Sequence, residues 1–134
     1  MPAKAIRKMV CRRRRSRNRY LPLEHKLLLV DGGPGVYQKI NEGTNNQNRA
    51  AAVVFAWTTI PYRTEWRYSF LSAKLIALDA GHLCQNLYLA ATAIGAGTCA
   101  LDAYDQHKLD TALGVDGNDE FSVYCAPVGK IPVD

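Results

Sequence analysis

The strongest hydrophobic pattern in the chain is an apolar stretch from Ser72 to Ala100. One apolar stripe within it recurs at steps of three and four residues: Leu83, Leu87, Ala90 and Ile94. This spacing predicts a long helix, and the glycines from Gly95 to Gly97 end it because glycine readily adopts a positive φ. A helix this apolar on every side must be buried, and we expect a second subunit to help bury it.

Shorter apolar runs predict a buried strand at residues 26–30, a central strand at 50–60, a short strand at 98–101 and a half-buried strand at 120–128, and residues 36–37 are expected to resume a strand. Residues 41–48 are polar and predict a loop, and residues 61–67 predict a connection. A short helix is predicted over residues 106–113, with Asp105 as its N-cap and Gly114 as its stop. This order of elements predicts an α+β domain.

The charge is concentrated at the N-terminus. Residues 1–19 carry nine Lys/Arg and no acid, whereas the remaining residues carry eight Lys/Arg and twelve Asp/Glu, so the net charge of +5 divides into +9 and −4. A basic segment without apolar periodicity predicts a disordered leader, followed by a single domain over residues 20–134. Binding of the leader to nucleic acid or to an anionic membrane is the less favoured interpretation.

The remaining composition points to a cytoplasmic protein. No apolar run of membrane-spanning length is free of charged or amide residues, and no signal peptide is recognisable. The four cysteines have no metal-ligand spacing, so no metal site is expected. Cys84 and Cys99 lie in apolar stretches and are interpreted as small core residues, which suits a reducing compartment.

Several side chains have two interpretations. His82 is either an acid/base group or a structural residue that bonds Asp79, three positions earlier on the predicted helix, and the structural role is favoured. Tyr62 and Trp66 either stack on a ligand or pack in the core.

Five segments, in this order and spacing, resemble the C-terminal half of the nitroreductase-like FMN flavoproteins. They are Arg63–Tyr68 (RTEWRY), Leu78–Leu87 (LDAGHLCQNL), Ile94–Ala100 (IGAGTCA), Leu113–Gly117 (LGVDG) and Pro127–Lys130 (PVGK). The segments are most similar to the SagB-type branch, which includes the azoline dehydrogenases of thiazole/oxazole-modified peptide biosynthesis. Residues 20–24 and 34–37 also resemble family landmarks, while the N-terminal part is shortened relative to the family.

The resemblance implies an FMN-dependent oxidoreductase with a mixed sheet flanked by helices, and an obligate homodimer with flavin in its interface. Hydride would pass between the flavin and a nicotinamide, NAD(P)H being a possible donor, or a small organic or peptide substrate. In the family the glycine turn after the long helix contacts the flavin, and here that turn holds Gly95, Gly97 and Thr98. Lys130 occupies the position of a cation near the FMN phosphate, and Ser16 that of a flavin-contacting serine.

Arg67 and Tyr68 occupy the position of the Lys-Tyr pair that azoline-oxidising members carry. By this resemblance Tyr68 would help remove a proton as hydride passes to the flavin. Arg67 remains protonated in proteins and is therefore a poor base.

Two departures from the family support an alternative function. The N-terminal R-R-S-x-R segment that helps hold FMN is imitated only in composition by Arg13–Arg17, and the stretch between Tyr37 and Ala50 is short. The alternative is a degenerate, non-catalytic subunit of the same fold that dimerises or binds a peptide.

Overall fold

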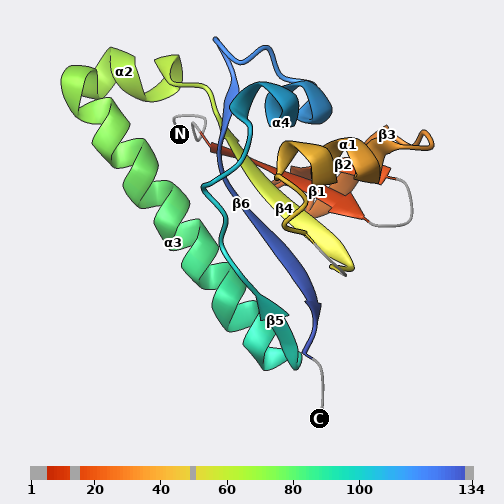
Figure 1. Ribbon diagram of the computed structural model, residues 1–134. Coiled ribbons are helices and arrows are strands. Elements are labelled where there is room, and N and C mark those ends of the chain that lie inside the picture. Colours follow the sequence, from red (N-terminus) through yellow and green to blue (C-terminus); the bar gives the residue numbers. More distant parts are fainter. Residues whose placement is uncertain (1–5, 13–15, 49–50, 132–134) are drawn as a thin grey trace.

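A single six-stranded sheet forms the centre of the molecule in the computed structural model, which describes residues 6–12, 16–48 and 51–131 (Figure 1). Across the sheet the strands are β3 (Lys26–Asp31), β2 (Ser16–Leu21), β1 (Ile6–Arg12), β4 (Val53–Thr59), β6 (Phe121–Lys130) and β5 (Ala96–Thr98). Every pairing between these strands is antiparallel, so the expected mixed sheet is corrected to an antiparallel one.

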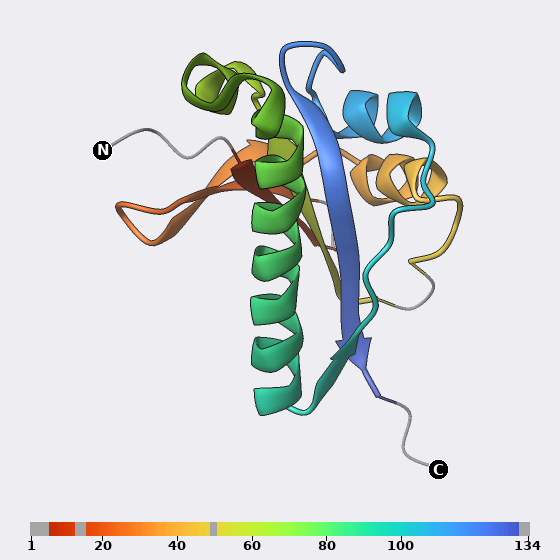
Figure 2. The ribbon, with the colours of Figure 1, turned by 90° about the vertical axis from the view of Figure 1, so that its left-hand side faces the viewer.

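Helices cover both faces of this sheet (Figure 2). On one face lie α1 (Val36–Gly43) and α4 (Gln106–Leu113), and on the other lies α3 (Ser72–Ala93), which follows α2 (Tyr62–Tyr68) and a 3₁₀ turn, η1 (Ser69–Leu71). Each face of the sheet has its own hydrophobic core, and side chains that alternate along β4 contribute to both. Ala56 packs with α1 and α4 on one face, while Trp57 packs with α3 on the other. The fold is therefore α+β, as expected.

Residues 6–12 and 16–19 of the basic N-terminal segment are part of the sheet, which corrects the prediction of a disordered leader there, while residues 1–5 and 13–15 lie outside the described residues. β1 lies between β2 and β4, and its Met9 and Cys11 side chains are fully buried. Arg7 of β1 finds a partner at the edge of this core, since its guanidinium donates to the Glu120 carboxylate at 2.8 Å. The predicted boundary at residue 19/20 also fails, because β2 runs across it.

Arg17 of β2 stabilises the C-terminus of α4. Its Nη1 donates to the Ala112 carbonyl oxygen at 3.2 Å, where the helix leaves its last carbonyls without partners. Gly114 follows with φ of 70°, and a Cβ at that position would collide with the same guanidinium. A residue expected to be solvated is thus a long-range helix cap.

The predicted helix over residues 106–113 is confirmed with both of its caps. The Asp105 side chain accepts a hydrogen bond from the Lys108 backbone N–H at 3.0 Å, and Gly114 ends the helix in the left-handed conformation. Two other predictions are wrong, since residues 36–37 begin α1 and residues 61–67 lie largely in α2. The predicted polar loop starts within α1, and its Thr44 and Asn48 are buried.

Helix α3 is confirmed, but its burial is one-sided. The side chains buried against the sheet are Ser72, Ile76, Ala80, Cys84 and Ala91. Of the predicted stripe, Leu83 and Leu87 are half-buried while Ala90 and Ile94 are exposed. The outward face also carries Leu78 and Leu89, so within one chain the expected burial on every side does not occur.

Two further burial predictions are wrong. The strand at residues 26–30 exists as β3, but it is the edge strand of the sheet and all of its residues are exposed. Cys84 is buried as predicted, whereas Cys99 is exposed. No helix in the described part of the chain is long and apolar enough to span a membrane.

Candidate functional site

The glycine turn after α3 is held beside the end of β6. Gly95 turns the chain with φ of 67°, and β5 then pairs with β6 in the register Ala96 to Lys130 and Gly97 to Gly129. The structure therefore brings together four of the predicted cofactor-binding residues: Gly95, Gly97, Thr98 and Lys130. They lie at the lower end of the molecule in Figure 1.

Local packing explains why glycine suits this turn. A Cβ at Gly97 would lie 3.1 Å from Cγ1 of Ile131, and a Cβ at Gly95 would project into open space. The backbone at Gly95 is thus accessible to a flat ligand. The Thr98 hydroxyl donates to the Pro127 carbonyl oxygen at 2.9 Å, which ties the turn to β6.

Lys130 supplies a positive charge at this turn. Its side chain is exposed, and the ion pairs among the described residues lie elsewhere, between Arg7 and Glu120 and between Lys108 and Asp105. An ammonium group in this position can meet a phosphate as a point charge.

Ser16 lies on the far side of the sheet from this turn. Ser16 pairs with Arg12, Arg12 with Val53, Val53 with Val128 and Val128 with Thr98. Four strand spacings separate Ser16 from Thr98, a distance of about 19 Å. The structure does not bring this predicted residue to the others.

Arg67 and Tyr68 are also remote from the turn within one chain. They end α2, and the Arg67 guanidinium carbon lies 5.5 Å from the centre of the Tyr68 ring. The 22 residues of α3 separate them from Gly95, which places the two predicted groups ~33 Å apart. Both side chains are exposed.

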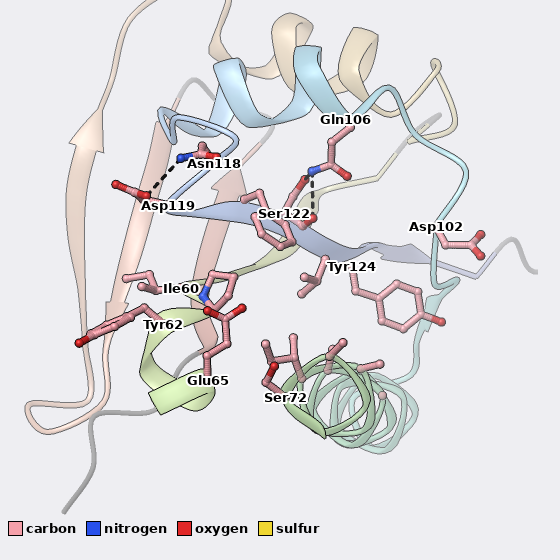
Figure 3. Close-up of a pocket in the computed structure, with 18 of the residues that line it drawn as sticks. Ile60, Tyr62, Glu65, Ser72, Asp102, Gln106, Asn118, Asp119, Ser122 and Tyr124 are labelled. Atoms are coloured by element: carbon pink, nitrogen blue, oxygen red, sulfur yellow. Dashed lines mark hydrogen bonds between the residues drawn. The ribbon is translucent and has the colours of Figure 1, made fainter. Parts of the chain in front are cut away.

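A large cleft of about 1280 Å³ opens at the α2 end of the molecule (Figure 3). Its walls come from α2, the first half of α3, β6, the linker before α4 and the turn before β6. Charged lining residues are Glu65, Asp102 and Asp119, and aromatic ones are Tyr62, Tyr104, Phe121 and Tyr124. Sequence reasoning missed this cleft because its lining comes from segments distant in the sequence.

The floor of the cleft is a connected polar network. The Gln106 side-chain amide donates to Ser122 Oγ at 2.9 Å and to Asp110 Oδ2 at 2.8 Å, and Asp110 Oδ1 accepts from the Ser122 backbone N–H at 2.7 Å. The Tyr104 hydroxyl donates to the Ser122 carbonyl oxygen, and burial raises the pKa of Tyr104 to about 12. Tyr104 is therefore a neutral hydrogen-bonding group at physiological pH.

Three side chains for which the sequence left two interpretations open, His82, Tyr62 and Trp66, all lie on the surface. His82 is exposed on α3, and neither Tyr62 nor Trp66 packs in the core. Trp66 Nε1 donates to the Arg63 carbonyl oxygen at 3.1 Å, and Tyr62 lines the cleft. Within the described residues no group of His, Cys, Asp and Glu could hold a metal ion.

Comparisons with solved structures identify the fold. A chain of the Escherichia coli microcin synthetase McbBCD complex, solved with truncated pro-MccB17 bound, superposes with a TM-score of 0.84 at 16% identity, over 96% of this chain and 53% of that one. A provisionally named nitroreductase from Anabaena variabilis superposes with a TM-score of 0.87 at 20% identity, over 94% of this chain and 27% of that one. The NADPH:FMN oxidoreductase of Vibrio harveyi, complexed with NAD+, superposes with a TM-score of 0.59 at 18% identity, over 73% of this chain and 46% of that one.

Comparisons of sequence identify the family. A Methanocaldococcus jannaschii protein, provisionally named a nitroreductase, is 29% identical over 68 residues, which cover 51% of this chain and 33% of that protein. This chain thus spans about a third of that curated relative. The model of the nitroreductase family matches residues 3–130, including the basic segment that forms β1 and β2. The chain belongs to the nitroreductase family.

Proposed function

We propose that this protein is an FMN-dependent oxidoreductase that acts as a homodimer. Hydride would pass between the flavin and a nicotinamide or an organic substrate. The observation that carries the proposal is the pairing of β5 with β6, which sets Gly95, Gly97 and Thr98 next to Lys130. Membership of the nitroreductase family supports it.

The residues at the turn fit an FMN group. The open space at Gly95 allows a flat ring system to approach the backbone, and the exposed Lys130 ammonium suits the phosphate. When bound, FMN supplies the redox chemistry, and the protein contributes orientation and charge. In this proposal the backbone of the turn holds the ring, while Lys130 holds the phosphate end.

A second copy of the chain is needed to complete the proposed site. Tyr68 and Gly95 lie ~33 Å apart along one copy, which is too far for one flavin to span. The outward face of α3 carries exposed apolar residues between these two ends, Leu78 and Leu89. Antiparallel pairing of two α3 helices through this face would bring Tyr68 of each copy to the glycine turn of the other.

Tyr68 is the proposed proton-transfer group in this composite site. Its hydroxyl can exchange a proton with the substrate, and the neighbouring Arg67 remains a cation that orients the ring. Azoline-type dehydrogenation of a peptide is the organic reaction for which this pair is proposed. The likeness to a chain of the McbBCD complex, which was solved with truncated pro-MccB17 bound, supports a peptide substrate.

Titration with FMN tests cofactor binding directly. We expect the purified protein to retain flavin absorbance after dialysis, and Lys130→Ala to weaken FMN binding by about 10-fold because a charge-assisted contact is lost. Lys39→Ala, which removes an exposed cation from α1, is the matched control and should bind FMN like the wild type. A protein that retains no flavin at any FMN concentration would exclude the oxidoreductase.

A non-catalytic dimerising or peptide-binding subunit is the second candidate. The observation that favours it is the position of Ser16, which lies four strand spacings from the turn at Thr98. Arg67, in place of the family's lysine, also favours it. A folded dimer that binds no flavin would support this candidate over the enzyme.

A further inference from the structure

We propose that the cleft between α2, α3 and β6 binds an organic cation, an ammonium or guanidinium ion attached to an apolar or aromatic body. The proposal is separate from FMN binding, because the cleft lies at the opposite end of α3 from the glycine turn.

The charge of the cleft selects a cation. Its lining contains the carboxylates of Glu65, Asp102 and Asp119 and no Lys, Arg or His among the described residues. Figure 3 shows Glu65 and Asp119 toward one end of the cleft and Asp102 toward the other. Anions such as nucleotide phosphates would be repelled here, so a nicotinamide donor is not expected to occupy this cleft.

An unpartnered hydroxyl also points to a ligand. Ser72 is only 6% exposed and lines the cleft, yet its hydroxyl has no hydrogen-bond partner within the described part of the chain. The oxygen of Ser72 can therefore accept a hydrogen bond from an ammonium or guanidinium N–H of a ligand in the cleft. Glu65, in the middle of α2, lies at the same end of the cleft (Figure 3).

The remaining walls suit an apolar body. Ile76, Ala77 and Ala80 form an aliphatic wall on α3, and Phe121 and Tyr124 face it from β6. Tyrosine rings attract cations through their negative faces in addition to providing apolar area. Tyr104 is neutral at physiological pH and adds no charge that would compete with the carboxylates.

The proposed dimer would give this ligand a role. In that arrangement the α2 end of each copy meets the glycine turn of the other, so a bound cation would be presented to the flavin as a substrate. This last step rests on the proposed function, whereas binding of the cation does not.

Three probes of similar size and different charge test the proposal on the full chain without added FMN: phenethylammonium, 2-phenylethanol and phenylacetate. Amide chemical-shift titrations are expected to show saturable binding of phenethylammonium with shifts at Gly81 and Ser122, and binding should weaken as NaCl is raised. The neutral alcohol should bind at least several-fold more weakly, and phenylacetate should not saturate. Equal binding of all three probes, or no saturable binding of the ammonium, would overturn the proposal.

Charge-neutralising variants locate the site. Glu65→Gln is expected to weaken phenethylammonium binding by about 3-fold, and Glu65→Gln with Asp119→Asn by about 10-fold. Asp79→Asn changes the net charge equally but lies on the exposed face of α3, away from the cleft, and should leave binding unchanged. An equal loss in Asp79→Asn would show a general charge effect and contradict the site. Since every measurement is made without flavin, failure of FMN binding cannot produce a negative result here.

Discussion

Long arginine side chains allow the basic residues of β1 and β2 to join the sheet. An arginine carries three methylene groups before its charge, so it can leave a buried strand and still reach a polar partner at the edge of the core. Arg7 does this by bonding Glu120, which also accepts from the Thr58 hydroxyl at 2.6 Å. Arg17 does so by reaching the Ala112 carbonyl oxygen. Nine cations in residues 1–19 therefore do not prevent strand formation.

Replacing Arg17 should test this role. Arg17→Ala removes the hydrogen bond to the Ala112 carbonyl oxygen and a positive charge from the C-terminus of α4. We expect the free energy of unfolding to fall by about 1 kcal/mol, measured by urea denaturation. Lys39→Ala, at an exposed position of α1, should change it by less than about 0.5 kcal/mol. Equal effects of the two changes would show that Arg17 is simply a solvated residue.

The cysteines provide a residue-level test of the core. Burial raises the pKa of Cys11 and of Cys125 to about 12 and also raises the pKa of Cys84, whereas Cys99 is exposed. Since the thiolate is the reactive form, one thiol of the native protein should react rapidly with a disulfide reagent near pH 8, and the other three slowly. Cys99→Ser should remove the rapid phase. Two or more rapid thiols in the native wild type would contradict the burial of the other cysteines.

At the scale of elements, the sequence was sufficient to predict a helix where a capping residue or a regular apolar repeat defines it. Asp105 and Gly114 bound α4 by contacts within four residues, and apolar periodicity predicted α3. Prediction failed where partners distant in the sequence decide the outcome. β1 is a strand because β2 and β4 pair with it, and β3 is exposed because no further strand among the described residues covers this edge.

The N-cap of α4 makes the stability of the protein depend on pH. The hydrogen bond from the Lys108 backbone N–H holds the pKa of Asp105 below its ordinary value of 3.8. A lowered pKa in the folded state means that this carboxylate stabilises the protein above the unfolded pKa and loses that effect as pH falls through the folded pKa. Asparagine caps helices almost as well and does not titrate.

We therefore expect Asp105→Asn to be close to the wild type in urea denaturation near neutral pH. Below about pH 4 the wild type should lose more stability than this variant. Asp79→Asn, which removes an exposed carboxylate from α3, should retain the pH dependence of the wild type. Parallel curves for the wild type and Asp105→Asn would show that the cap does not titrate differently in the folded state.

At the scale of the whole molecule, the candidate residues separate into two groups at opposite ends of α3. The turn from Gly95 to Thr98 with Lys130 lies at one end, and Tyr68 with the acidic cleft lies at the other. The sequence resemblance could predict Gly95, Gly97, Thr98, Lys130 and Tyr68 as candidates, but neither their separation nor the cleft, because both depend on how distant segments pack in space. In the proposed homodimer, a second copy would unite the two groups into one redox site.

Mixing two inactive variants tests this arrangement. Tyr68→Phe should lose proton transfer, and Lys130→Glu should lose flavin, so each homodimer should be inactive. In a composite site, a heterodimer of the two variants contains one site with both changes and one site with neither. After subunit exchange in an equimolar mixture, half of the dimers are heterodimers, and activity should recover to roughly a quarter of the wild type. If each copy held a complete site of its own, every site in the mixture would carry one of the changes, and no activity would return.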